Sequence, residues 1–172
     1  MEVVKYPGPA LRRGGKKIEV FGPELAETAR QMLETMYTSE GVGLAAPQVA
    51  LDQSLLVLNP TGERDAPEGE MVLVNAEIVA RKGHEYGEEG CLSFPGLYAE
   101  VERATKITVT YQDLEGRPQE LRADGFLARV IQHEIDHLRG VLFVDRLSSI
   151  EKLRVRTQLQ DMERRFAEAA RT

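Results

Sequence analysis

The strongest chemical signal in the sequence is the segment His133-Glu134-Ile135-Asp136-His137. Two histidines four positions apart on a helix lie on one face, one turn apart, and their imidazoles can bind a single metal ion. The glutamate between them then lies beside the metal, where it can take a proton from water. The alternative is a pair of core histidines hydrogen-bonded to backbone or carboxylate groups. Because these are two of only three histidines, the spacing favours a metal site with Glu134 as its base.

A metal site of this kind needs a third protein ligand. The longer zinc-protease pattern would supply a histidine six residues after His137, but position 143 is Phe143. Cys91 is the single cysteine of the chain and lies in the block Glu89-Gly90-Cys91-Leu92-Ser93. Its thiolate would complete a Cys-His-His set with one position open for water, and the neighbouring glycine lets the backbone approach another element closely. These residues predict Cys91, His133 and His137 as the ligands.

Other side chains remain candidates for the third ligand position. His84 lies between Gly83 and Glu85 and is typical of an exposed turn, so it ranks second. Glu151 or Glu163 on the last predicted helix would instead give a small zinc endopeptidase. In that case the block around the cysteine would have no part in catalysis.

The histidine pair requires a helix, and the surrounding sequence predicts one from Asp124 to Leu138. Asp124 can cap its first turn, and Gly140 is well placed to end it. Apolar residues cover much of its circumference, which predicts that the helix is buried. They are Phe126, Leu127, Ala128, Val130, Ile131, Ile135 and Leu138.

The remaining elements predict an α+β domain over residues 1–172, with antiparallel strands packed around this buried helix. A second helix is expected from Pro23 to Tyr37, and a third at about 148–170 that begins with a capping box of Ser148 and Glu151. The glycine-rich stretch 41–48 is expected to be loop-like. Strands are predicted at 55–58, 71–79 and 107–111, and after a turn at 113–116 up to residue 121.

Composition limits the function classes. The chain has no apolar run long enough to span a bilayer, and its N-terminus does not resemble a signal peptide. A formal net charge of -6 argues against a general DNA-binding surface. A lone cysteine excludes an internal disulfide and suits a reducing compartment, so we expect a cytoplasmic protein.

Three blocks, in order, resemble the signature motifs of peptide deformylases. They are Gly41-Val42-Gly43-Leu44-Ala45-Ala46-Pro47-Gln48, Glu89-Gly90-Cys91-Leu92-Ser93 and Gln132-His133-Glu134-Ile135-Asp136-His137-Leu138. The early segment from Tyr6 to Arg12 and the helical tail are also similar, so the resemblance covers the whole chain. The family removes the formyl group from the formyl-methionine that begins new bacterial and organellar proteins.

The resemblance implies a divalent metal ion bound by Cys91, His133 and His137. Fe²⁺ is often the ion in that family, and Zn²⁺, Ni²⁺ or Co²⁺ can substitute. Glu134 would accept the proton of the attacking water and return it to the departing amine. The Gln48 side-chain amide and the Leu92 backbone N–H would stabilise the oxyanion.

The same resemblance implies where a formyl-methionyl nascent peptide binds. Gly43 and Gly90 would leave room for a formyl hydrogen but not for a larger acyl group, and the backbone around Val42 could pair with the substrate in β-fashion. The sequence departs from some relatives at Arg129 and Tyr98. Arg129 either rims the pocket and contacts the substrate, or points to solvent. The expected lining of the methionine pocket is Val42, Phe126, Val130 and His133.

The C-terminal tail is a candidate for binding a partner. Residues 148–172 hold six Lys/Arg and four Asp/Glu, so the tail could carry a basic face that binds the ribosome, or simply a solvated face.

Arg103 resembles a position that forms a structural salt bridge with Glu89. Beside deformylase and endopeptidase, a third hypothesis is a non-catalytic, family-like binding module, but the intact Glu134 and ligand set argue against it.

Overall fold

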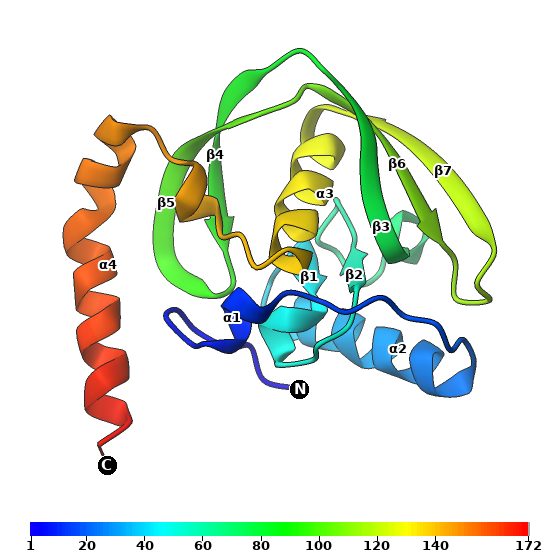
Figure 1. Ribbon diagram of the computed structural model, residues 1–172, viewed down its shortest axis with the longest axis horizontal. Coiled ribbons are helices and arrows are strands. Elements are labelled where there is room, and N and C mark those ends of the chain that lie inside the picture. The colour runs from blue at the N-terminus through cyan, green and yellow to red at the C-terminus, as the bar shows by residue number, and fades with distance from the viewer. Residues whose placement is uncertain (172) are drawn as a thin grey trace.

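Residues 1–171 are described by a computed structural model, which consists of two antiparallel sheets and four α-helices (Figure 1). Thr172, the last residue of the predicted domain, lies outside this range. The larger sheet has the strand order β1-β2-β3-β6-β7, and β4 and β5 form a separate hairpin. The strands are β1 Gly43–Ala45, β2 Leu55–Leu58, β3 Met71–Lys82, β4 Glu85–Cys91, β5 Phe94–Arg103, β6 Lys106–Gln112 and β7 Pro118–Asp124. The helices are α1 Ala10–Arg13, α2 Pro23–Thr38, α3 Gly125–Leu138 and α4 Ser149–Ala169, with 3-10 turns η1 Ala46–Val49, η2 Pro67–Gly69 and η3 Phe143–Arg146.

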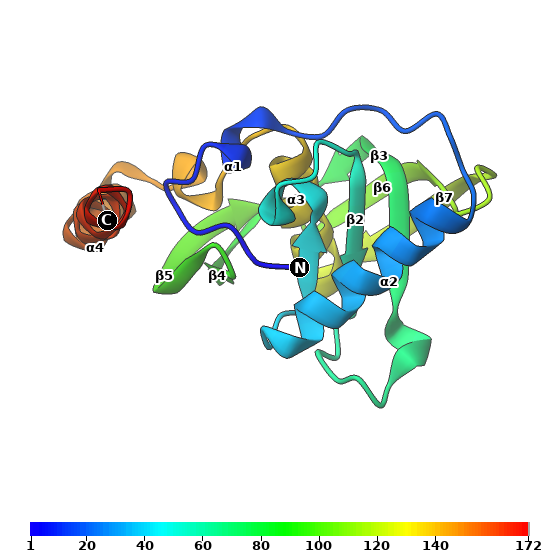
Figure 2. The same ribbon diagram turned by 90° about the horizontal axis from the view of Figure 1, so that it is seen from below.

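The larger sheet is covered on both faces by helices (Figure 2). Because successive side chains of a strand point to opposite faces, Leu56 and Leu58 of β2 pack with α3, whereas Leu55 and Val57 pack with α2. The side chains that α3 contributes include Ala128, Ile131, Ile135 and Leu138. The apolar face of α3 is therefore used against the sheet.

The β4–β5 hairpin belongs to a different apolar cluster. Leu97, Ala99 and Val101 of β5 pack with Phe143 of η3 and with Val155 of α4. Helix α4 stands at the outer side of this hairpin, away from the larger sheet (Figure 1). Val155 is its only buried residue within the described part of the chain.

The predicted α+β architecture, with antiparallel strands and a C-terminal helix, is confirmed. The predicted strand at 55–58 is reproduced residue for residue, and the helix from Pro23 ends one residue later than expected, at Thr38. Two expectations at the helix ends differ. Asp124 makes no side-chain capping hydrogen bond, because β7 runs directly into α3 through Gly125 at φ 55. Only half of the Ser148 capping box forms, since the Glu151 carboxylate binds Arg154 and the Glu100 N–H instead.

Three strands were not expected from the sequence. The glycine-rich stretch expected to be loop-like contains strand β1 and the turn η1. The hairpin of β4 and β5 lies where no strand was expected, and it carries Cys91 at the end of β4. Among residues 1–171, no helix combines the length and the apolar character needed to cross a membrane.

The packing of α4 generates a stability prediction. Val155→Ala removes two methyl groups from a fully buried side chain and should lower the free energy of unfolding by about 2 kcal/mol. Leu153→Ala on the same helix is the matched control: its side chain is exposed, and the change should stay within about 0.5 kcal/mol. Urea denaturation of both variants measures the difference. Equal losses would mean that α4 does not pack on β5 as described.

Candidate metal centre and active site

Cys91, His133 and His137 converge on one point. The Cys91 Sγ lies 3.4 Å from His137 Nε2, and His137 Nε2 lies 3.3 Å from His133 Nε2. In residues 1–171 this is the only group of three or more His, Cys, Asp or Glu residues whose donor atoms could hold a metal ion. Donors bound tetrahedrally at about 2.0–2.3 Å lie about 3.3–3.8 Å from one another. The observed separations fit that geometry, so these three residues suit a single metal ion.

The other candidate ligands lie elsewhere. His84 is exposed in the turn between β3 and β4, with its Nε2 3.9 Å from a Glu102 oxygen. Glu163 accepts a hydrogen bond of 2.6 Å from the Tyr6 hydroxyl. Glu151 is bound to Arg154 on α4. None of these side chains belongs to the cysteine–histidine group.

Glu134 is buried next to this group, and its Oε2 has no hydrogen-bond partner among the described residues. Burial raises the pKa of Glu134 to about 7, against the opposing effect of the charge on His133. A carboxylate oxygen without a protein partner is available to a water molecule. The residue is therefore suited to accept and release a proton.

Gln48 is oriented by the backbone on one side and faces the cysteine on the other. Its Oε1 accepts a hydrogen bond of 2.9 Å from the Ala45 N–H, which directs the Nε2 group towards Cys91 Sγ at 3.4 Å and Ser93 Oγ at 3.2 Å. The turn η1 places this side chain, which is almost completely buried. An amide N–H thus points at the metal-binding group.

Two glycines keep the space around these residues narrow. A Cβ at Gly43 would lie 2.6 Å from Glu134 Oε1, and one at Gly90 would lie 2.5 Å from the Tyr98 ring. Both distances are shorter than van der Waals contact. A side chain at either position would therefore displace a neighbour in the site.

A cavity of about 280 Å³ opens beside the candidate metal ligands. Tyr98 and Phe126 are more than half exposed and form part of its wall. The cavity is lined by all the residues for which the sequence suggested substrate contact, namely Val42, Gly43, Gly90, Tyr98, Phe126, Arg129, Val130 and His133. It is also lined by Gln48, Leu92 and Glu134.

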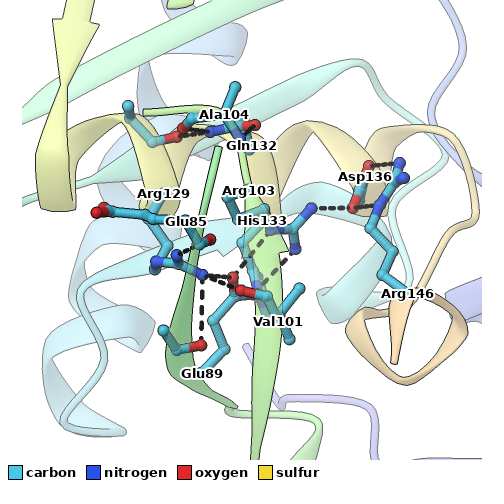
Figure 3. Close-up of polar contacts among 12 residues, drawn as sticks. Glu85, Glu89, Val101, Arg103, Ala104, Arg129, Gln132, His133, Asp136 and Arg146 are labelled. Atoms are coloured by element: carbon cyan, nitrogen blue, oxygen red, sulfur yellow. Dashed lines mark hydrogen bonds and ion pairs between the residues drawn. The ribbon is translucent and has the colours of Figure 1, made fainter. Parts of the chain in front are cut away.

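A buried ionic network lies behind the histidines, centred on Glu89 (Figure 3). His133 Nδ1 lies 2.9 Å from Glu89 Oε1, which leaves Nε2 for the metal. Arg103 donates to both oxygens of Glu89 at 2.9 Å, as the sequence suggested. Burial alone would raise the pKa of Glu89, but the hydrogen bonds from Arg103 and His133 outweigh it and lower the pKa to about 2. Glu89 therefore stays ionised and accepts from His133.

The network extends further than the sequence indicated. Arg103 also donates to Asp136 at 2.6 Å, and Arg146 donates to both oxygens of Asp136. Arg129 does not point to solvent: it is buried, and it donates to Glu89 at 2.8 Å. One sequence feature could have revealed this larger network. Asp136 lies on a helix expected to be buried, and a buried carboxylate needs a cation as its partner.

The family model for polypeptide deformylases matches residues 1–153. The chain belongs to this family. It is 44% identical to a peptide deformylase of Chromobacterium violaceum over 95% of the chain and 96% of the relative, and 42% identical to the chloroplastic peptide deformylase 1B of Oryza sativa over 98% of the chain and 63% of the relative. Among solved structures, peptide deformylase 1B of Arabidopsis thaliana matches with a TM-score of 0.94 at 40% identity, covering 100% of this chain and 95% of the other.

As a peptide deformylase, the protein is a metal-dependent hydrolase that removes the formyl group from formyl-methionyl nascent polypeptides and releases formate. The endopeptidase and non-catalytic readings of the sequence are therefore wrong. Two members of the cysteine–histidine group, Cys91 and His133, line the cavity described above.

The crowding at Gly43 predicts a specific loss of activity. Gly43→Ala should push the Glu134 carboxylate away from its position and lower kcat for a formyl-Met peptide at least about 10-fold, because small misplacements in a site are costly. Gly41→Ala is the control, since its Cβ would meet only the flexible end of Leu92. Formate release measures both. A Gly43→Ala enzyme as fast as the control would show that the carboxylate position does not matter.

Proposed function

We propose that Cys91, His133 and His137 bind one divalent metal ion and that Glu134 is the general base of deformylation. The observation that carries this proposal is the unpartnered Glu134 Oε2 beside a three-donor group with tetrahedral spacing. A thiolate ligand favours Fe²⁺, Co²⁺, Ni²⁺ or Zn²⁺ over Mg²⁺ or Ca²⁺. Of these, Fe²⁺ is the ion we propose in the cell, on the resemblance to the family.

The ion, when bound, supplies Lewis-acid activation of water and of the formyl carbonyl. Glu134 takes the proton of the attacking water and later gives it to the departing amine, so that the same carboxyl acts as base and then as acid. The Gln48 Nε2 group and the Leu92 N–H donate hydrogen bonds to the developing oxyanion. Removing such a donor typically costs roughly 3–4 kcal/mol of transition-state stabilisation.

Substrate selection follows from the walls of the cavity. Gly43 and Gly90 border the narrow part, where a formyl hydrogen fits and a larger acyl group meets neighbouring side chains. Beyond them, the methionine side chain packs against the wall made by Val42, Phe126, Val130 and His133, with Tyr98 at the exposed mouth. Strand β1 is an edge strand, so the backbone near Val42 can pair with an extended peptide.

We propose that residues 1–172 act as one catalytic domain whose central scaffold is α3, and that it works in the cytoplasm, where nascent chains are made. Binding to the ribosome through α4 remains a prediction. Three of the tail arginines already pair with acids on the same helix: Arg154 with Glu151, and Arg164 and Arg165 with Asp161. This pairing reduces the basic face to Lys152, Arg156 and Arg171, which form no ion pair within the described residues.

Substitution of the base tests the mechanism. Glu134→Gln keeps the size of the side chain but removes its basicity, and it should lower kcat by about 10²–10⁴ while metal content stays near one ion per chain. Formate release and metal analysis on the same preparation give both values. Turnover near the wild-type rate in a metal-replete variant would remove Glu134 from the mechanism.

A pair of substitutions tests the ligand set. Cys91→Ser should bind metal much more weakly, because a hydroxyl stays protonated near neutral pH and is a poor ligand. His84→Ala should keep both metal and activity, since His84 is exposed and lies outside the ligand group. Metal content after dialysis measures the difference. The reverse result, an empty His84→Ala and a loaded Cys91→Ser, would contradict the assignment.

A further inference from the structure

The candidate ligands come from two units that do not share a sheet or an apolar cluster. Cys91 ends strand β4, and the β4–β5 hairpin pairs with no strand of the larger sheet. The apolar side chains of β5 pack towards η3 and α4, whereas those of α3 pack on the larger sheet. The hairpin meets the histidine-bearing helix through ion pairs and hydrogen bonds, while Phe143 of η3 packs on the His133 ring. Polar contacts therefore help to hold the cysteine at ligand distance.

Arg129 crosses this boundary from α3. Its Nη1 donates to Glu89 Oε2 and to the Val101 carbonyl, both at 2.8 Å, and its Nη2 donates to the Glu85 carbonyl at 3.1 Å. One guanidinium therefore binds both strands of the hairpin (Figure 3). Gly87 makes room for it, because a Cβ there would lie 2.9 Å from Arg129 Cζ.

Glu89 transmits this constraint to the ligands. It lies two residues before Cys91 on the same strand, and the Cys91 Sγ lies 3.4 Å from His137 Nε2. The other oxygen of Glu89 is 2.9 Å from His133 Nδ1. Arg103 also binds Glu89, but it lies on β5 within the hairpin and reaches α3 only through Asp136. Arg129 is thus the arginine of α3 that binds the hairpin directly.

We propose that Arg129 is a positioning residue that holds the Cys91 thiolate at ligand distance from His133 and His137. The proposal rests on the proposed ligand set. Arg129 lines the cavity with its side chain, but its donors are directed to the hairpin rather than to a substrate. Arg129→Met keeps a long side chain in the cavity wall and leaves Glu89 paired with Arg103 and His133. Glu89 therefore keeps two of its partners in this variant.

The first measurement is metal retention. Zn²⁺-loaded protein is mixed with a chromogenic chelator, and Arg129→Met should release zinc about 10-fold faster than the wild type, in the range typical of residues that orient ligands. Arg129→Lys should be intermediate, since an ammonium can pair with Glu89 but cannot also reach both carbonyls. Val155→Ala is the control for lost stability and should release zinc at the wild-type rate.

The second measurement needs no metal. Cys91 is the only cysteine, so alkylation of metal-free protein by iodoacetamide reports on one thiol. It should proceed about 3-fold faster or more in Arg129→Met, because the hairpin opens from α3 more often. Failure of wild-type protein to bind zinc would refute the ligand set, and the alkylation rates would still decide the role of Arg129.

Two results would overturn the proposal. One is unchanged zinc release and unchanged alkylation in Arg129→Met. The other is an increased KM for a formyl-Met peptide with normal zinc release, which would make Arg129 a substrate contact. If Arg129→Met did not fold, zinc release, alkylation and KM would be measured in Arg129→Lys instead. Faster zinc release and faster alkylation would support the positioning role, and unchanged rates or an increased KM alone would exclude it.

Discussion

The structure depends on one buried carboxylate, that of Glu89. It accepts hydrogen bonds from Arg103 and Arg129 and holds Nδ1 of His133, with every partner at 2.8 or 2.9 Å. A charge in this position would be strongly destabilising if it lost its partners, since burial of an isolated ion costs several kcal/mol. Because two guanidiniums donate hydrogen bonds to it, the Glu89 carboxylate instead links β4, β5 and α3 at one point. The same contact orients His133, a proposed metal ligand.

This arrangement divides the surface of α3 between two tasks. One side is apolar and packs on the larger sheet through residues such as Ile131 and Ile135. The other side carries Arg129, His133 and Asp136 and meets the hairpin through ion pairs. Polar groups in a low-dielectric interior must find their partners in specific directions. The hairpin is therefore held in one defined position, which a three-donor metal site requires, whereas apolar contacts alone would allow it to slide.

Backbone approaches two side chains of the proposed active site closely. A Cβ at Gly43 would lie 2.6 Å from Glu134 Oε1, and one at Gly90 would lie 2.5 Å from the Tyr98 ring. Such approaches are open only to residues without a Cβ. In the proposed mechanism, this close packing leaves room for a formyl hydrogen but not for a larger acyl group, and it also fixes the position of Glu134, the proposed base.

The sequence by itself determined the features that depend on local periodicity. Helical spacing placed His133 and His137 on one face, and a short continuous apolar run predicted the strand at 55–58. It missed β4, whose segment Glu-Tyr-Gly-Glu-Glu-Gly-Cys has no apolar alternation, although Leu97, Ala99 and Val101 could have predicted β5. Only the tertiary structure decided which side chains meet across distant segments. Cys91 was expected to join His137 as a ligand because a third donor was needed, but the fold fixes how they meet across 46 positions. The direction of Arg129 depends on a hairpin that helical periodicity cannot locate. Contacts between distant segments depend on how whole elements pack, and a local pattern carries no information about that packing.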